Sequence, residues 1–310
     1  MSLASLLRTA AVCAAVLSPL AAAPALAAPA SSAAAPAVQT IDRSRFTVEV
    51  SGSGPDVILI PGLASGRAVY DGITPALAQH YRVHRIQIAG FAGQAAGPNA
   101  EGAVVDPTIE ALHRYIVDQH LQRPAVIGHS LGGLSGLLLA QRHPEDVGRL
   151  MIIDAAPFFS ALFNPTATAA SVEPYAAQMR DMMTGMADDQ FAAGQQRTAA
   201  TLVLTPSQRQ TMVDWSLASD RKVMARAMYD VMITDARPGL AAMTTPVTVL
   251  YAFDPSIGFT APNSDAFWGG FYAALPGVKM IRVDGAYHFI MLDQPERFAR
   301  EVDGFLAAGR

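Results

Sequence analysis

A serine between two glycines stands where an apolar run gives way to a helical pattern. Residues 125–127 (AVI) are typical of a buried strand, residues 128–132 (GHSLG) follow, and a helix is expected from Leu131 to Arg142. A G-x-S-x-G sequence at a sharp strand-to-helix turn needs small neighbours, and the turn lifts the serine hydroxyl above the sheet near a helix N-terminus. This context predicts that Ser130 is a nucleophile rather than part of an ordinary glycine-rich turn.

A serine hydroxyl needs a base, and His288 is the candidate. Of the seven histidines, only His288 lies beyond both Ser130 and the helical region described below, just past the last expected strand. His80 and His84 are spaced like a metal-binding pair, but their segment is strand-like and offers no nearby carboxylate, so we interpret them as surface or packing residues. His143 precedes Pro144 at a helix end, where positive charge is favourable.

The histidine needs a carboxylate to orient it, and three aspartates are candidates. For a nucleophile on a turn of this kind, the expected chain order is serine, acid, histidine. Asp254 is preferred, because it ends the strand before the last and so lies at the same sheet edge as Ser130 and His288. Asp154 ends the strand before that and is the rival, with hydrogen bonding to loop backbone as its other interpretation. Asp265, expected on a helix, is the third choice.

A tetrahedral intermediate also requires hydrogen-bond donors for its oxyanion. The backbone N–H of Leu131, directly after the nucleophile, is one expected donor. The second is expected from the loop after the strand at residues 56–60, at Leu63, where Gly62 allows close approach of the backbone.

The elements that position these residues alternate along the chain. Continuous apolar strands separated by helices predict an α/β fold, with a mostly parallel sheet covered by helices on both faces. Strands are expected within residues 46–50, 56–62, 81–90, 124–130, 149–157, 246–255 and 278–285, and helices around residues 109–116, 131–142 and 295–309.

Residues 156–245 interrupt the alternation, because they contain no convincing strand. This stretch is rich in Ala, Met and Gln and is expected to form a helical lid inserted between two late strands. Its methionines are typical of a helix core, and on another face they suit a pliable wall over a binding pocket. We therefore expect an apolar acyl pocket suited to uncharged esters. The candidate wall residues are Phe158, Phe159, Phe163, Met179, Met183, Phe259, Phe267, Trp268 and Phe271.

Together these motifs resemble the α/β-hydrolase superfamily over about residues 47–307, and within it the haloperoxidase-like and esterase-like branch. The resemblance implies a serine hydrolase that cleaves carboxylic esters through an acyl-enzyme, with Ser130, Asp254 and His288 as the triad and Leu63 and Leu131 as oxyanion donors. It implies no cofactor and no metal. Two departures concern the loops: Pro61-Gly62 replaces the His-Gly of many members, and residues 89–97 (AGFAGQAAG) lack the usual Asp and Arg.

Several alternatives remain open at this point. An amidase, peptidase or lactonase would use the same triad, and a ligand-binding protein would keep the pocket with poor turnover. Superfamily members that split epoxides or halides use an aspartate nucleophile, and Ser130 at the elbow argues against both.

Composition limits the classes of partner that we expect the protein to bind. The chain has 310 residues, of which 51% are hydrophobic and 15% charged, and its net charge is −4. We therefore expect a small-molecule substrate and no nucleic-acid partner, since no Lys/Arg stretch forms a basic footprint. No apolar run beyond the N-terminus is long enough to span a bilayer.

Residues 1–27 have the layout of a secretory signal peptide. Arg8 precedes an Ala/Leu/Val stretch, and residues 25–27 (ALA) form a small-x-small cleavage pattern. We expect a periplasmic or secreted protein without stable membrane insertion after processing. Cleavage removes Cys13, the only cysteine, which excludes disulfides and cysteine catalysis. Residues 28–40 are expected to be a disordered leader, 41–155 and 246–310 the hydrolase core, and 156–245 the lid.

Overall fold

The computed structural model describes residues 39–42 and 44–308. The expected signal peptide, residues 1–27, and most of the expected leader lie outside the described residues. The first strand begins at Gln39, slightly before the expected start of the folded part near Ile41.

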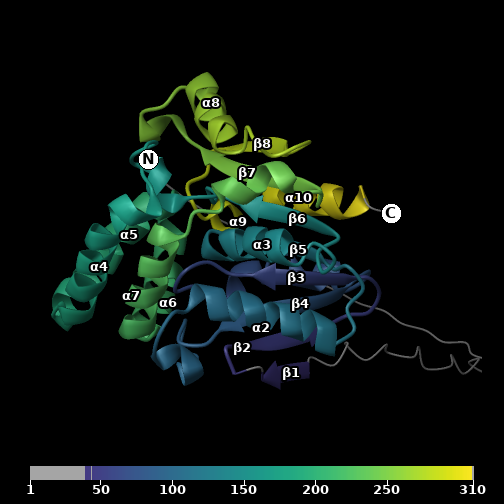
Figure 1. Ribbon diagram of the computed structural model, residues 1–310, viewed down its shortest axis with the longest axis horizontal. Helices are drawn as coiled ribbons and strands as arrows, with labels where there is room; N and C mark the ends of the chain where they lie inside the picture. Colours follow the sequence, from purple (N-terminus) through teal and green to yellow (C-terminus); the bar gives the residue numbers. More distant parts are fainter. Residues whose placement is uncertain (1–38, 43, 309–310) are drawn as a thin grey trace, which may run out of the picture. The chain divides into compact units, whose positions relative to one another are not determined.

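One sheet of eight strands forms the centre of the described chain, in the order β1-β2-β4-β3-β5-β6-β7-β8 (Figure 1). β3 to β8 are parallel, whereas β1 and β2 run antiparallel at one edge. The prediction of a mostly parallel sheet is therefore confirmed. The strands are β1 (Gln39–Asp42), β2 (Phe46–Ser51), β3 (Asp56–Ile60), β4 (Arg82–Ile88), β5 (Ala125–His129), β6 (Arg149–Ile153), β7 (Val247–Phe253) and β8 (Lys279–Asp284).

Helices cover both faces of the sheet, and alternate strand residues supply the two cores. Val126 of β5 packs in a cluster with Leu112 and Leu137, whereas its neighbour Ile127 packs with Phe298 and Val302 on the other face. This is the period of two that a strand buried on both faces requires. The helices are α1 (Thr74–Leu77), α2 (Val105–Asp118), α3 (Leu131–Arg142), α4 (Ala169–Gly185), α5 (Asp188–Leu202), α6 (Pro206–Ala218), α7 (Arg221–Ile233), α8 (Ala261–Phe271), α9 (Ile290–Asp293) and α10 (Pro295–Ala307).

The long connection between β6 and β7 is helical, and we call its four main helices, α4 to α7, the insertion. The described chain between Ile153 and Val247 contains no strand. α4 packs along α7, and α5 packs along α6. The insertion gathers beyond one end of the sheet (Figure 1), and its side chains reach the same cavity as those that follow β5 and β6. None of the described helices is long and apolar enough to cross a membrane.

Strand register lines up the ends that carry the site. Gly128 of β5 lies between Ile60 of β3 and Ile152 of β6. The N–H of Ser130 donates to the carbonyl of Ile153, 2.9 Å away, so Ser130 and Asp154 leave adjacent strands at one level.

Candidate active site

Ser130 occupies a strained turn between β5 and α3. Its φ of 53° and ψ of −117° are rarely adopted by residues other than glycine. The flanking glycines are required because neither position has room for a Cβ atom. A Cβ on Gly128 would lie 2.2 Å from the carbonyl oxygen of Gly132, and a Cβ on Gly132 would lie 2.2 Å from that of Ile60. The strain is therefore maintained by close packing of the turn against β3 and α3, as expected of a nucleophile elbow.

His288 and Asp154 lie beside this turn and bind each other. The Nδ1 of His288 lies 2.7 Å from Oδ2 of Asp154. The second carboxylate oxygen, Oδ1, accepts a hydrogen bond from the N–H of Ala252 at 2.8 Å. Asp154 is buried, and its backbone φ of 48° turns the chain sharply after β6. With both oxygens occupied, the carboxylate is fixed and holds one tautomer and one orientation of the imidazole.

The structure does not place Asp254 against His288, which corrects the sequence-based choice of acid. Oδ1 of Asp254 accepts hydrogen bonds from the N–H of Ser256 at 2.9 Å and from its hydroxyl at 2.5 Å. These bonds lower the pKa of Asp254, the side-chain bond first. The carboxylate caps a short 3₁₀ turn, Pro255–Ile257, instead of reaching the histidine.

Asp265 is also engaged elsewhere. It lies on α8, as expected, and accepts hydrogen bonds from Tyr251 Oη at 2.7 Å and from Arg282. These hydrogen bonds, that of Tyr251 first, lower the pKa of Asp265. Of the three candidate aspartates, Asp154 alone reaches His288.

The two expected oxyanion donors border the same cavity as Ser130. Leu131 is the first residue of α3, where a backbone N–H has no acceptor within the helix. Leu63 lies in the loop after β3, next to Ala64, whose φ is 55°. Both leucines line the cavity. Gly62 is tightly packed, since a Cβ there would lie 2.9 Å from Nδ1 of His129.

A cavity of about 700 Å³ opens above Ser130. Among the described residues that line it, Asp154 is the one Asp, Glu, Lys or Arg. Of the nine expected wall residues, Phe158 and Phe271 do not line the cavity. Phe158 is buried with Ala161 and Ala167, and Phe271 contacts the rings of Phe267 and Trp268. The seven that line it are Phe159, Phe163, Met179, Met183, Phe259, Phe267 and Trp268.

Two residues of the site were not anticipated. The ring of His129, the residue before Ser130, is fully buried and lies 4.6 Å from that of His288, centroid to centroid. Asp293 accepts hydrogen bonds from the N–H groups of Tyr287, Leu204 and Thr205 at 2.9, 3.1 and 2.8 Å. It thereby ties the His288 loop to the connection between α5 and α6. The position of His129 inside the G-x-S-x-G sequence was a signal that it belongs to the site. The partners of Asp293 lie too far away along the chain to be read from the sequence.

The remaining histidines lie outside the cavity. His84 is buried between Tyr115 Oη, 2.7 Å from its Nδ1, and Oδ1 of Asp56, 2.9 Å from its Nε2. His80 is exposed. His84 packs in the interior, which was one of its two sequence-based interpretations. It also has a carboxylate partner, Asp56, where the sequence suggested none. Within the described residues, one group of three potential metal ligands lies close together, and it is away from the cavity.

Known proteins resemble this chain in sequence over most of its length. The profile of the Alpha/beta hydrolase family matches residues 57–301. A pimeloyl-[acyl-carrier protein] methyl ester esterase of Aromatoleum aromaticum is 29% identical over 252 residues, covering 78% of this chain and 94% of that protein.

Solved structures show the same fold at low sequence identity. A Pseudomonas aeruginosa hydrolase superposes with a TM-score of 0.69 at 20% identity, covering 87% of this chain and 98% of that one. A Bacillus anthracis bromoperoxidase gives 0.71 at 18% identity, covering 87% and 100%. The profile match extends over most of the described chain, from β3 to α10, and includes the Ser130 turn, Asp154 and His288. The protein therefore belongs to the α/β-hydrolase family.

Proposed function

We propose that the protein hydrolyses carboxylic esters through an acyl-enzyme, with Ser130 as nucleophile, His288 as base and Asp154 as the acid that orients it. The observation that carries this proposal is the geometry of the elbow: a strained serine shares one cavity with a histidine that is hydrogen-bonded to a buried carboxylate. The relatives named as methyl ester esterases favour ester over amide chemistry.

The reaction follows from these positions. His288 Nε2 removes the Ser130 hydroxyl proton as Oγ attacks the ester carbonyl, and Asp154 stabilises the imidazolium that forms. The N–H groups of Leu131 and Leu63 bind the oxyanion. Collapse of the tetrahedral intermediate transfers the proton to the departing alcohol. Water then attacks the acyl-enzyme by the same steps, and the acid is released.

The cavity favours an uncharged acyl group. Its wall is mainly apolar, with Leu, Met, Phe and Ala as the most frequent residues, and burying a charged group there without a partner would cost several kcal/mol or more. We propose that the substrate is a small ester whose acyl chain is apolar along most of its length.

Labelling and turnover test the proposal together. A fluorophosphonate should label the wild-type protein in one-to-one stoichiometry, and labelling should be lost in Ser130→Ala but kept in Ser207→Ala, which changes an exposed serine on α6. p-Nitrophenyl esters should be hydrolysed, with a fall in kcat on the order of 10⁶ in Ser130→Ala. Faster turnover of p-nitroanilides or lactones than of esters would instead identify an amidase or a lactonase.

We also propose that the protein is exported, on the strength of residues 1–27 alone. Mass spectrometry of protein from its native host should give a mature N-terminus near Ala28. An intact Met1 would contradict export by cleavage.

A further inference from the structure

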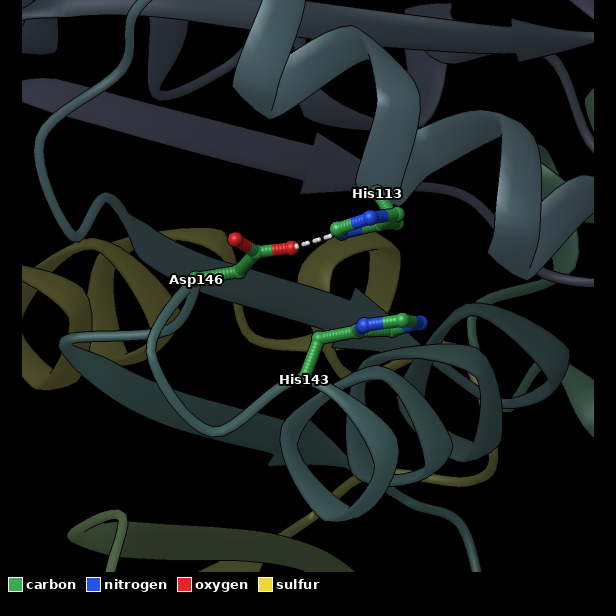
Figure 2. Close-up of side chains that lie close together, drawn as sticks. All are labelled: His113, His143 and Asp146. Carbon is green, nitrogen blue, oxygen red and sulfur yellow. Dashed lines mark hydrogen bonds and ion pairs between the residues drawn. The ribbon is translucent and has the colours of Figure 1, made fainter.

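Two histidines and an aspartate gather at the end of α3 that is remote from Ser130. His113 lies on α2, His143 is the C-cap of α3, and Asp146 lies in the loop that leads to β6 (Figure 2). Since α3 has twelve residues and rises about 1.5 Å per residue, the cluster is roughly 18 Å along the helix from the elbow. It is therefore separate from the ester site.

The three side chains lie close to one another. One ligand-type atom from each lies within 4.8 Å of the others. Nδ1 of His113 lies 2.6 Å from Oδ2 of Asp146, and the imidazole rings of His113 and His143 stack face to face with centroids 3.8 Å apart and planes 9° apart (Figure 2). A metal ion binds an imidazole through a nitrogen lone pair, and each of these two rings offers one nitrogen atom to the group.

Other polar groups around this cluster also favour a bound cation. Nε2 of His143 is buried and forms no hydrogen bond, although Oε2 of Glu110 lies 3.5 Å away. Two neighbouring carboxylates, Asp106 and Glu110, share the guanidinium of Arg142, whereas Asp146 pairs with His113. The cluster is therefore electrostatically suited to an added positive charge.

We propose that His113, His143 and Asp146 form a binding site for a divalent transition-metal ion such as Zn²⁺. Two imidazoles and one carboxylate suit Zn²⁺, whereas Mg²⁺ and Ca²⁺ prefer oxygen ligands. Zn²⁺ holds its ligands about 2 Å away. An imidazole lone pair lies in the plane of its ring, so one of the two stacked rings must turn before both histidines can bind the same ion. The ion would join α2 to the loop between α3 and β6 and would stabilise the fold without touching the ester site.

The test uses the full-length, untagged protein after treatment with a chelator. Titration with ZnCl₂ in a calorimeter should give one bound ion per chain, and Tm should rise with Zn²⁺ concentration. His143→Gln leaves the bond between His113 and Asp146 in place and should weaken Zn²⁺ affinity at least about tenfold, as should His113→Gln. His80→Gln, which changes an exposed histidine outside the cluster, should bind like the wild type.

Equal Zn²⁺ affinity in the wild type and His143→Gln, or no binding by the wild type, would overturn the site. Ester hydrolysis by the chelator-treated protein should match that of the Zn²⁺-loaded protein. A rate that depends on Zn²⁺ would contradict the stabilising role assigned to the ion.

A separate observation lies within the cavity and deepens the proposed function, on which it rests. Gln195 of α5 lines the apolar cavity and is only 7% exposed, yet its Oε1 has no hydrogen-bond partner among the described residues. Leaving a buried acceptor of this kind unpaired is unfavourable. We infer that the Gln195 amide binds a hydroxyl or N–H group of the substrate, so that the preferred acyl chain is apolar except for one hydrogen-bond donor.

A set of six-carbon methyl esters tests this subsite. The hydroxyl is placed in turn on each chain carbon beyond the ester carbonyl, and methyl hexanoate is the reference. At least one isomer should exceed methyl hexanoate about tenfold in kcat/KM, and this preference should vanish in Gln195→Met but remain in Gln196→Met, an exposed neighbour. Unchanged ratios in Gln195→Met would overturn the subsite. Hydrolysis of methyl hexanoate itself reports on the proposed function independently.

Discussion

The Nε2 of His129 lies 3.0 Å from the backbone carbonyl oxygen of His288, so one ring supports the main chain of the other histidine. A carbonyl can only accept, and Nε2 is therefore the protonated nitrogen of His129. Burial, and secondarily the charge that His288 can carry, lower the pKa of His129 well below its ordinary value. His129 thus stays neutral at physiological pH and keeps this donor.

His129→Phe should lower kcat about fivefold while KM changes little, because the ring volume remains but one hydrogen bond worth about 1 kcal/mol is lost. His129→Gln, which retains a side-chain donor, should recover part of kcat. Steady-state kinetics on one p-nitrophenyl ester distinguish the cases. A kcat unchanged in His129→Phe would show that His288 needs no support from this ring.

Asp154→Asn should reduce kcat by about 10⁴, since an amide at this position no longer fixes the productive tautomer of His288. Asp254→Asn should stay within a few-fold of the wild type, because its carboxylate contacts Ser256. A fluorophosphonate should label Asp154→Asn more slowly than the wild type and should label Asp254→Asn at the normal rate. A greater fall in kcat in Asp254→Asn than in Asp154→Asn would show that Asp254, at the end of β7, is the acid that orients His288.

Residue types and strand ends were enough to predict the nucleophile turn and the histidine, but not the acid. Asp154 and Asp254 both follow parallel strands, and which one meets His288 depends on the path of the loop after β8. A local signal was available: Asp254 precedes Pro255 and Ser256, a sequence that favours capping of a short turn by its own carboxylate. The β1 strand was also missed, because its pairing with β2 is a contact between segments rather than a pattern within one.

Substrate length should respond to Met183 and not to Met182. Met183 lines the cavity, whereas Met182 is 51% exposed on the same helix. In a p-nitrophenyl ester series, kcat/KM should rise by up to about fourfold per methylene until the cavity is full, since each buried methylene contributes about 0.8 kcal/mol. Met183→Trp should shift the maximum to a shorter acyl chain. Met182→Trp serves as the control, and a shift there or a flat wild-type profile would argue against an apolar acyl site.

Acid stability should depend on Asp56. Burial alone would raise the pKa of Asp56, but hydrogen bonds from His84 and Arg82 outweigh burial and lower it below 3.8. A carboxyl whose folded pKa is depressed stabilises the fold above its unfolded pKa, and this stabilisation is lost as pH falls through the folded value. Tm of the wild type should therefore drop more steeply below about pH 4 than Tm of Asp56→Asn.

A matched variant separates this effect from general acid unfolding. Asp71→Asn removes an exposed ion-pair partner of Arg85 and should leave the shape of the curve unchanged. Parallel curves for Asp56→Asn and the wild type would contradict the assignment.

Three helices of the insertion, α5 to α7, are anchored in the cores of the sheet, whereas α4 packs along α7. The cluster on one face of the sheet includes Ala199 of α5, Val203 at the C-cap of α5 and Val213 of α6. The cluster on the other face includes Val223, Ala227 and Val231 of α7. Swinging these helices away as a flap would expose buried apolar surface at every step. We therefore expect no interfacial activation: the rate should follow a simple hyperbola as ester concentration passes the solubility limit, without the abrupt rise that a hinged cover would give at an oil–water boundary.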